Sequence, residues 1–308
     1  MYFPYFRGRQ YELLALKELA SNSLISNKII PLVEPVKIIP ALNNALSAFQ
    51  KESLPIGFVL NPEVGEFAGN AEAITRIASI ANSFSDIIPA LLINRNVEKA
   101  IELMPNKNVD IENLLVVLTE PDFLPDYDDL REGKWPKYTL CPYERSINRR
   151  VTKNAVLFEE HFNKKPRNAD YPEDELFSND HLDYKLDHYI GFGDYSIIGK
   201  EYVESGFAPY AVAIHIVYFT DRKSLRIRHF ISDSREDTSD VAGKFYEAVS
   251  KLYSWYIESH MENQLTYGLK VMLDHYYNKT YPGLPTLKKL SIMHHLELIN
   301  KYLSGGLF

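Results

Sequence analysis

The first half of the chain alternates short apolar runs with segments of helical spacing, and this alternation constrains the fold more than any other feature. The runs are rich in Ile, Val and Leu and have the length of buried strands. They cover residues 29–36, 55–61, 87–94, 114–120, 138–144 and 155–161. Helical spacing is found in residues 11–20, 71–83 and 97–104. Because strand, helix and strand in succession form parallel crossovers, we expect an α/β fold with a TIM-barrel-like strand-helix repeat.

Each apolar run ends on a polar residue. The positions are Glu34, Asn61, Asn94, Glu120, Glu144 and Glu160. In a β/α barrel the carboxyl ends of the strands form the mouth at which ligands bind. Converging acids there would make a site for a divalent metal or a substrate, with Glu34 and Glu120 as catalytic candidates and Asn61 and Asn94 as binding candidates. The other interpretation is that a strand turns polar simply because the chain leaves the core.

The second half has a different texture. Residues 210–219 and 225–232 are strand-like, and the five-residue link between them suits a hairpin and is too short for a crossover helix, so an antiparallel pair is predicted. Residues 240–303 have helical character and form a C-terminal helical part. We therefore predict one barrel-like domain over residues 1–308. Residues 163–190 form an insertion over its mouth, either ordered or a mobile solvated loop.

The segment GFGDYSIIG, residues 191–199, contains two glycines that permit a tight turn and would expose backbone N–H groups to an anion. Its glycine spacing is not that of a dinucleotide fingerprint, and no Walker lysine follows. Asp194 is therefore a candidate catalytic or ligand-binding carboxylate. The alternative is an Asp that bonds its own backbone in a turn.

The predicted hairpin carries basic side chains. Strand alternation places Arg226 and Arg228 on one face, where two guanidinium groups would suit a phosphate or carboxylate. The alternative is that they pair with nearby acids of the insertion, such as Glu173, Asp174 or Glu175. Both interpretations remain open from the sequence.

Three further candidates lie on or beside the same hairpin. His215, His229 and Asp233 would form a metal or acid/base site if they met across adjacent strands. His215 is the catalytic candidate among them, and His229 and Asp233 are binding candidates. A buried histidine bonded to a carbonyl is the alternative for each imidazole.

Composition narrows the partners. The formal net charge is −7, from 34 basic and 41 acidic residues, so duplex-DNA binding through bulk positive charge is disfavoured. Binding to nucleic acid is then expected only through a partner protein or a local basic patch. The 21 tyrosines, against 2 tryptophans, indicate half-buried surfaces such as a cleft or a partner face.

Location and enzyme class follow from missing signals. The single Cys141 forms no internal disulfide, and the sequence has neither a secretory signal nor an apolar run of membrane-spanning length, so a cytoplasmic protein is expected. The sequence has no GxSxG elbow, HExxH or paired CxxC motif, and Cys141 is interpreted as structural. No complete catalytic signature is present.

Several stretches together resemble a known family. They are YFPYFRGRQYELLALKELA, IIPLVEPV, GFGDYSIIG, KKPRNADYP, SGFAPYAVAIHIVYF, LRIRHFISD and PGLPTLKKLSIMHHLEL. The chain resembles the bacterial beta family, named after a T-even phage beta protein, and within it a subgroup usually encoded beside a nuclease-like protein. The resemblance runs nearly end to end. It implies a TIM-barrel-like fold, a setting in anti-phage defence or mobile elements, and a co-encoded partner, and it supplies no catalytic residues.

Two functions from different classes remain open. The first is a non-catalytic binding or scaffold component of an anti-phage defence or mobile-element system, acting with a partner protein through an aromatic-rich surface and an anion-binding patch. The alternative is a hydrolase acting on a phosphorylated or nucleotide substrate at the barrel mouth. The hydrolase requires Glu34, Asp194 and Arg228 to converge on one site.

Overall fold

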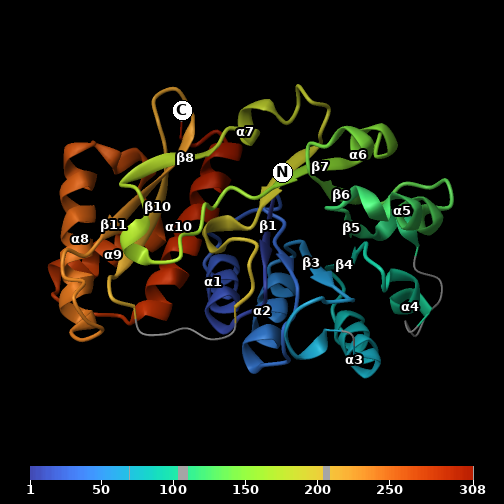
Figure 1. Cartoon of the computed structure of the whole chain (residues 1–308), viewed down its shortest axis with the longest axis horizontal. Helices are drawn as coiled ribbons and strands as arrows, with labels where there is room; N and C mark the ends of the chain where they lie inside the picture. Colours follow the sequence, from blue (N-terminus) through green and yellow to red (C-terminus); the bar gives the residue numbers. More distant parts are fainter. Residues whose placement is uncertain (69, 103–109, 204–208, 308) are drawn as a thin grey trace. The chain divides into compact units, whose positions relative to one another are not determined.

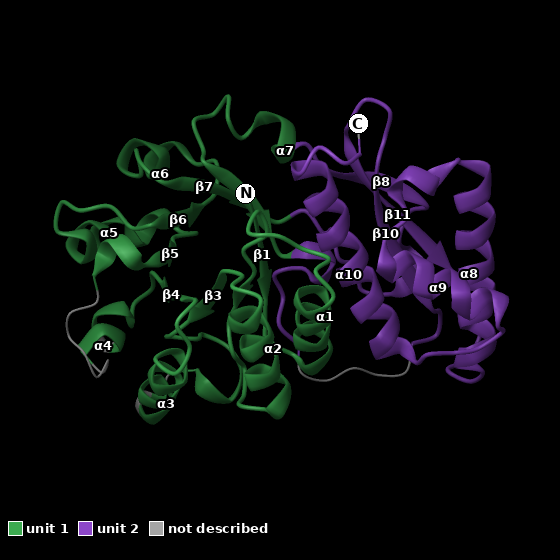
Figure 2. Ribbon diagram, turned by 180° about the vertical axis from the view of Figure 1, so that it is seen from behind, with its two compact units in different colours: residues 1–160, 180–195 green, residues 161–179, 196–308 purple. Residues whose placement is uncertain are grey.

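The structure is a computed structural model that describes residues 1–68, 70–102, 110–203 and 209–307. The chain divides into two compact units, coloured separately in Figure 2. Unit 1 contains residues 1–160 and 180–195, and unit 2 contains residues 161–179 and 196–308. The predicted insertion is thus shared, since its first part belongs to unit 2 and its second part to unit 1. Each unit has its own sheet and its own helices.

Unit 1 is a closed barrel of parallel strands, which confirms the predicted TIM-barrel-like α/β fold (Figure 1). The strand order around the barrel is β1-β2-β3-β4-β5-β6-β7-β9. The bounds are β1 Tyr2–Phe6, β2 Leu32–Val33, β3 Ile56–Val59, β4 Ile87–Leu92, β5 Leu115–Val117, β6 Tyr138–Cys141, β7 Ala155–Glu159 and β9 Gly191–Asp194. All six apolar runs identified in the sequence supply strands, and β1 and β9 complete the closure.

Helices follow the strands and pack their apolar stripes against the barrel. Their bounds are α1 Gln10–Ser21, α2 Pro40–Lys51, α3 Ala71–Ala81, α4 Val97–Glu102, α5 Leu124–Arg131, α6 Arg145–Arg150 and α7 Asp180–Asp183. Local chemistry fixes where they start. Asn70 caps α3 by accepting the N–H groups of Glu72 and Ala73, and Glu144 caps α6 in the same way from Ser146 and Ile147. Glu144 is therefore a helix cap at the end of its strand.

The barrel interior is filled by side chains from alternate strand positions. The buried cluster contains Phe3, Tyr5, Ile30, Leu32, Val59, Ile88, Ala90, Leu92, Leu115, Val117, Leu140, Val156, Phe158 and Tyr195. Large aromatic rings from β1 need space on the strand beside them, and β9 provides it with glycines. Cys141 is also buried, and burial raises the pKa of its thiol to about 12, which agrees with its interpretation as a structural residue.

Gly191 and Gly193 belong to strand β9, so the predicted tight turn at these glycines is wrong. Neither has a positive φ. A Cβ atom on Gly193 would overlap the backbone oxygen of Phe3, and one on Gly191 would lie 2.9 Å from the backbone oxygen of Met1. These glycines are required for close approach between β9 and β1, and not for backbone conformation.

Unit 2 is built on a three-stranded antiparallel sheet of order β10-β11-β8. Its strands are β8 Asp174–Ser178, β10 Ala213–Phe219 and β11 Leu225–Ile231. The β10–β11 hairpin confirms the predicted antiparallel pair, with His215 directly opposite His229. β8 comes from the segment predicted as an insertion. Three long helices complete the unit and confirm the helical C-terminal part: α8 Val241–Glu258, α9 Tyr267–Tyr277 and α10 Leu284–Leu303 (Figure 2).

α10 is buried along most of its length and carries two adjacent histidines. His294 Nε2 lies 2.7 Å from the Val217 carbonyl oxygen and its Nδ1 lies 2.8 Å from Thr266 Oγ1. His295 Nδ1 lies 2.9 Å from Ser196 Oγ. Burial lowers the pKa of His294 to about 4 and that of His295 to about 3. Both imidazoles are neutral at physiological pH and act as internal hydrogen-bonding groups.

Among the described residues, no helix combines the length and the apolar character needed to cross a bilayer.

Candidate functional site

Polar side chains gather at the carboxyl ends of the first four barrel strands. We call the following residues the barrel-end cluster: Tyr5, Arg7, Glu34, Asn61, Glu63 and Asn94. They lie on or just after β1 to β4. Because parallel strands end at one edge of a sheet, residues distant in sequence meet here.

Glu34 is the centre of this cluster and is fully buried. The Tyr5 hydroxyl donates to Glu34 Oε2 at 2.7 Å, and the Arg7 guanidinium donates to the same oxygen. The backbone N–H of Glu63 donates to Oε1 at 2.7 Å. Both carboxylate oxygens are therefore engaged, and the adjacent cation compensates the buried charge.

The two predicted binding amides are also bonded within the barrel. Asn61 Nδ2 donates to the Leu92 carbonyl at 2.8 Å and Oδ1 accepts the Leu92 N–H at 2.9 Å. Asn94 Nδ2 donates to Glu63 Oε1 at 2.6 Å, while its Oδ1 accepts the N–H of Asn96 at 2.9 Å. Asn61 thus extends the pairing of β3 with β4, and Asn94 joins two loops.

Aromatic rings form the base of the cluster. Tyr5 and Tyr195 have centroids 5.1 Å apart, and the Arg7 guanidinium carbon lies 5.1 Å and 5.7 Å from their respective ring centroids. Burial raises the pKa of both phenols, and the charge of Glu34 raises that of Tyr5 further. Both hydroxyls therefore remain protonated at neutral pH. The arrangement fixes Arg7 between a carboxylate and two aromatic faces.

The structure does not bring Asp194 or Glu120, the other catalytic candidates of unit 1, into contact with Glu34. Asp194 is paired in register with Pro4, which alternates with the interior residues Phe3 and Tyr5, so its side chain lies on the outer side of the barrel. There it accepts the Tyr2 hydroxyl at 2.7 Å. Glu120 is exposed and precedes a short 3₁₀ helix, Pro121–Phe123.

The predicted arginine patch belongs to unit 2 and is paired with acids from β8 and the residue before it. Arg226 donates to Asp174, which also accepts the Tyr218 hydroxyl at 2.6 Å. Arg228 donates to Glu173. Of the two interpretations left open by the sequence, the structure therefore shows internal pairing across the sheet.

The histidines of the hairpin do meet. His215 Nδ1 lies 2.7 Å from His229 Nδ1, and His229 Nε2 lies 3.2 Å from Glu175 Oε1. Asp233 is not part of this group, since its carboxylate accepts Lys251 Nζ at 2.6 Å. Burial, helped by the charges of His229 and Lys288, lowers the pKa of His215 to about 3. Within the described ranges, no set of three or more His, Cys, Asp or Glu side chains is arranged to hold a metal ion.

Sequence reasoning missed a tyrosine surface on the C-terminal helices of unit 2. We call Tyr246, Tyr253, Tyr276 and Tyr277 the tyrosine face. Tyr253 stacks on Tyr276 with centroids 4.4 Å apart, and Tyr246 stacks on Tyr276 at 5.6 Å. The seven-residue spacing of Tyr246 and Tyr253 puts both on one side of α8, and it is the signal that would have found them.

The tyrosine face borders a small apolar cavity and remains accessible. Tyr277 is 59% exposed and Tyr246 is 37% exposed. A cavity of about 270 Å³ lies beside Tyr246 and is lined by Ala242, Phe245, Tyr246, Lys279, Thr280 and Tyr281. The face therefore combines flat exposed rings with a pocket large enough for an apolar side chain.

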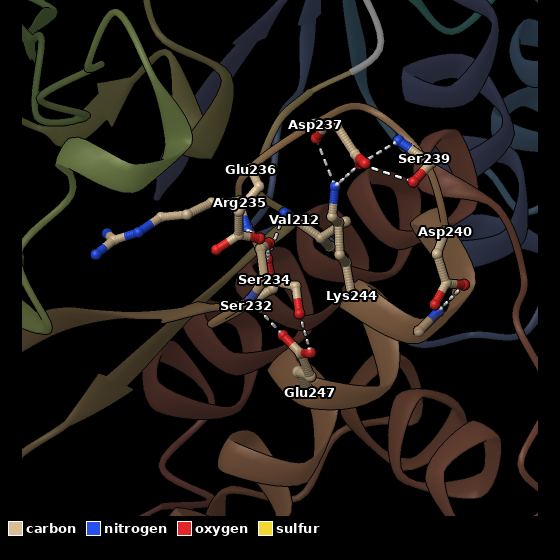
Figure 3. A network of polar contacts seen from close by, with 11 residues as sticks. Val212, Ser232, Ser234, Arg235, Glu236, Asp237, Ser239, Asp240, Lys244 and Glu247 are labelled. Atoms are coloured by element: carbon tan, nitrogen blue, oxygen red, sulfur yellow. Dashed lines mark hydrogen bonds and ion pairs between the residues drawn. The ribbon is translucent and has the colours of Figure 1, made fainter.

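The start of α8 is held by a polar network in the loop after β11 (Figure 3). Glu247 accepts the N–H of Asp233 at 2.7 Å, and both the N–H of Ser234 at 2.9 Å and its hydroxyl at 2.5 Å. Lys244 is buried and donates to the Asp237 carbonyl at 2.6 Å. These bonds fix the end of α8 that carries Tyr246.

Comparisons of the chain with protein-family models, with curated proteins and with solved structures found no match.

Proposed function

We propose that this protein is a binding component that acts with a partner protein in anti-phage defence or mobile-element biology, in the cytoplasm. The setting, and a co-encoded nuclease-like protein as the partner, rest on the beta-family resemblance. The tyrosine face is the observation that supports a binding role. Tyrosine is enriched at protein interfaces because it supplies a large rigid contact area with few rotatable bonds and a polar tip.

The tyrosine face suits a protein partner for two reasons. Its rings already stack on one another, so little side-chain freedom is lost when a partner covers them. The adjacent cavity would receive an apolar anchor residue, which is how binding hot spots are commonly built. The network at Glu247 and Lys244 supports the helix that presents these rings.

The test is binding to the co-encoded partner, with the tyrosines as the variable. The double variant Tyr246→Ala and Tyr277→Ala should weaken binding about 30-fold or more, since loss of a hot spot costs roughly 2 kcal/mol or more. Tyr210→Ala is the matched control, because Tyr210 is 60% exposed in unit 2 and lies outside the tyrosine face. Binding would be measured by calorimetry on purified proteins.

Two outcomes would overturn the proposal. One is that the wild-type protein and the co-encoded protein do not associate at micromolar concentration. The other is that the double variant and Tyr210→Ala bind the partner equally well. Self-association through the tyrosine face, seen by light scattering and lost in the double variant, would also replace the partner with a second copy of this chain.

The hydrolase alternative still requires Glu34, Asp194 and Arg228 to converge on one site. Glu34 is bonded inside the barrel end and Asp194 on the outer side of the barrel. Arg228 belongs to unit 2 and pairs with Glu173. None of these contacts favours a hydrolytic site over a binding role.

A further inference from the structure

A second cavity, inside unit 2, has a distinct chemical character. Its volume is about 220 Å³. Its lining residues include Phe162, Lys164, Asn168, Tyr171, His215, Lys288 and Ser291. Two lysines and a histidine thus line the cavity, and no carboxylate is among its lining residues in the described part of the chain. A small number of polar groups in a cavity that is otherwise mostly apolar is typical of a ligand site.

The hydrogen bonds of the two histidines fix the tautomer of His215. An ionised Glu175 can only accept, so His229 Nε2 carries the proton of the 3.2 Å contact. A neutral His229 then has an unprotonated Nδ1, which must accept the proton of His215 Nδ1 across 2.7 Å. A neutral His215 is consequently left with an unprotonated Nε2, which can accept a further hydrogen bond.

This Nε2 is open to a ligand. It makes no hydrogen bond to any described residue and retains accessible surface, while His215 lines the cavity. Phe162 and Tyr171 hold the ring in place, with centroids 5.2 Å and 4.7 Å from that of His215. The imidazole is therefore oriented before any ligand arrives.

We propose that this cavity binds a phosphate-class anion, with Lys164 and Lys288 supplying positive charge and His215 Nε2 accepting a hydrogen bond from a protonated phosphate oxygen. A phosphate-class anion has both hydrogen-bond acceptors for the lysines and a hydrogen-bond donor for the imidazole. Its unprotonated oxygens accept from the lysines, and its P–OH group donates to the bare imidazole nitrogen. Lys164 already contacts Glu201 at 3.4 Å, an exposed pair that exchanges readily for a better anion.

The groups around His215 keep its imidazole neutral, so that Nε2 accepts a hydrogen bond only from a ligand that carries a proton. His215 faces His229 on β11, Lys288 on α10, and Lys164 and Tyr171 from the 161–179 segment. Behind His229 lie Glu175 and Asp174, together with Lys165. Burial and the charges of His229 and Lys288 lower the pKa of His215 to about 3, so its imidazole is neutral near pH 6. Sulfate has no proton to donate at that pH, and phosphate has.

The experiment compares inorganic phosphate with inorganic sulfate by calorimetry at pH 6 on the full chain. We expect phosphate to bind at least tenfold more tightly than sulfate. Lys288→Ala should weaken phosphate binding about tenfold or more. Lys289→Ala, the next residue on the helix, does not line the cavity and should leave binding unchanged.

A third variant isolates the imidazole nitrogen. In His215→Asn the amide can replace Nδ1 in the contact with His229 but has no group at the position of Nε2. It should keep a wild-type melting temperature and lose the preference for phosphate over sulfate. A nucleoside monophosphate in a parallel titration separates a phosphoryl group on a larger ligand, which binds more tightly than phosphate, from free phosphate, which does not.

The proposal is overturned if phosphate gives no saturable heat, if phosphate and sulfate bind equally, or if Lys288→Ala and Lys289→Ala behave alike. It is independent of the partner experiment, because the cavity contains none of the tyrosine face.

Discussion

At the scale of single residues, the role of a polar side chain at the end of a barrel strand depends on the side chain that it contacts. The sequence identified Glu34, Asn61 and Asn94 correctly as strand-end positions. It did not identify Arg7, because Arg7 follows β1, and β1 was not recognised as a strand within the aromatic start of the chain. With Arg7 in place, a predicted site for a cation becomes an internal ion pair. Side-chain partners of this kind are set by three-dimensional neighbours, which strand patterns do not report.

The Arg7–Glu34 pair should be strongly coupled. Glu34→Gln leaves the guanidinium buried without its counter-charge, so we expect a loss of about 3–5 kcal/mol in the free energy of unfolding. Arg7→Met should cost a similar amount. The double variant Arg7→Met and Glu34→Gln should recover most of the loss, because no isolated charge remains and the amide still accepts from Tyr5 and Glu63. Urea denaturation of the four proteins measures this, and additive losses in the double variant would contradict it.

At the scale of elements, most of the predicted strands and helices are right, and the errors fall on β1, β8 and β9. In β9 the glycines were assigned to a turn, since glycine is used for positive φ as well as for close approach. Only the position of Phe3 on the neighbouring strand distinguishes these uses. In β8 the acids Asp174 and Glu175 concealed a strand, because they face the arginines and histidine of β11 across the sheet. Both strands are recognised only from their pairing with a strand that is distant in sequence, β9 with β1 and β8 with β11.

The close approach of β9 to β1 predicts a graded cost for added methyl groups. Gly193→Ala would push a Cβ into backbone, which cannot move aside, and we expect a loss of about 3 kcal/mol in the free energy of unfolding. Gly57→Ala meets the end of the Leu32 side chain at 2.8 Å, which can adjust, so the loss should be smaller. Gly306→Ala meets its nearest atom at 3.5 Å and is the neutral control. Thermal melts in which Gly57→Ala costs as much as Gly193→Ala would contradict this account.

At the scale of the whole molecule, the sequence showed a change of texture near the middle of the chain but not how the chain divides. The barrel repeat and the hairpin were both predicted, and each is the core of one compact unit. The boundary is crossed more than once, because residues 161–179 supply β8 to unit 2 before residues 180–195 complete the barrel. Local sequence does not reveal that β8 belongs to a different unit from the segments on either side of it, and that is why the sequence predicts an insertion here.

Unit 2 should lose stability on acidification before the surface carboxylates respond. Burial depresses the pKa of His294 to about 4 and that of His295 to about 3, against about 6.5 in an unfolded chain. Below pH 6.5 these two histidines are therefore protonated in the unfolded state but remain neutral in the folded state. The free energy of unfolding consequently decreases as the pH falls. Hydrogen bonds from serine lower the pKa of Asp237 and of Glu247, so their smaller contributions are lost only at more acidic pH.

Between pH 6.5 and 4.5 each buried histidine should cost about 2–3 kcal/mol in the free energy of unfolding. His295→Asn can keep the contact to Ser196 and removes the titrating group, so it should be less stable than the wild type at pH 7 and should lose less on acidification. His260→Asn, at an exposed position, is the control and should follow the wild type at every pH. The measurement is a series of urea denaturations at pH 7, 5.5 and 4.5. If the stability of His295→Asn falls as steeply as that of the wild type, buried neutral histidines are not the source of acid sensitivity.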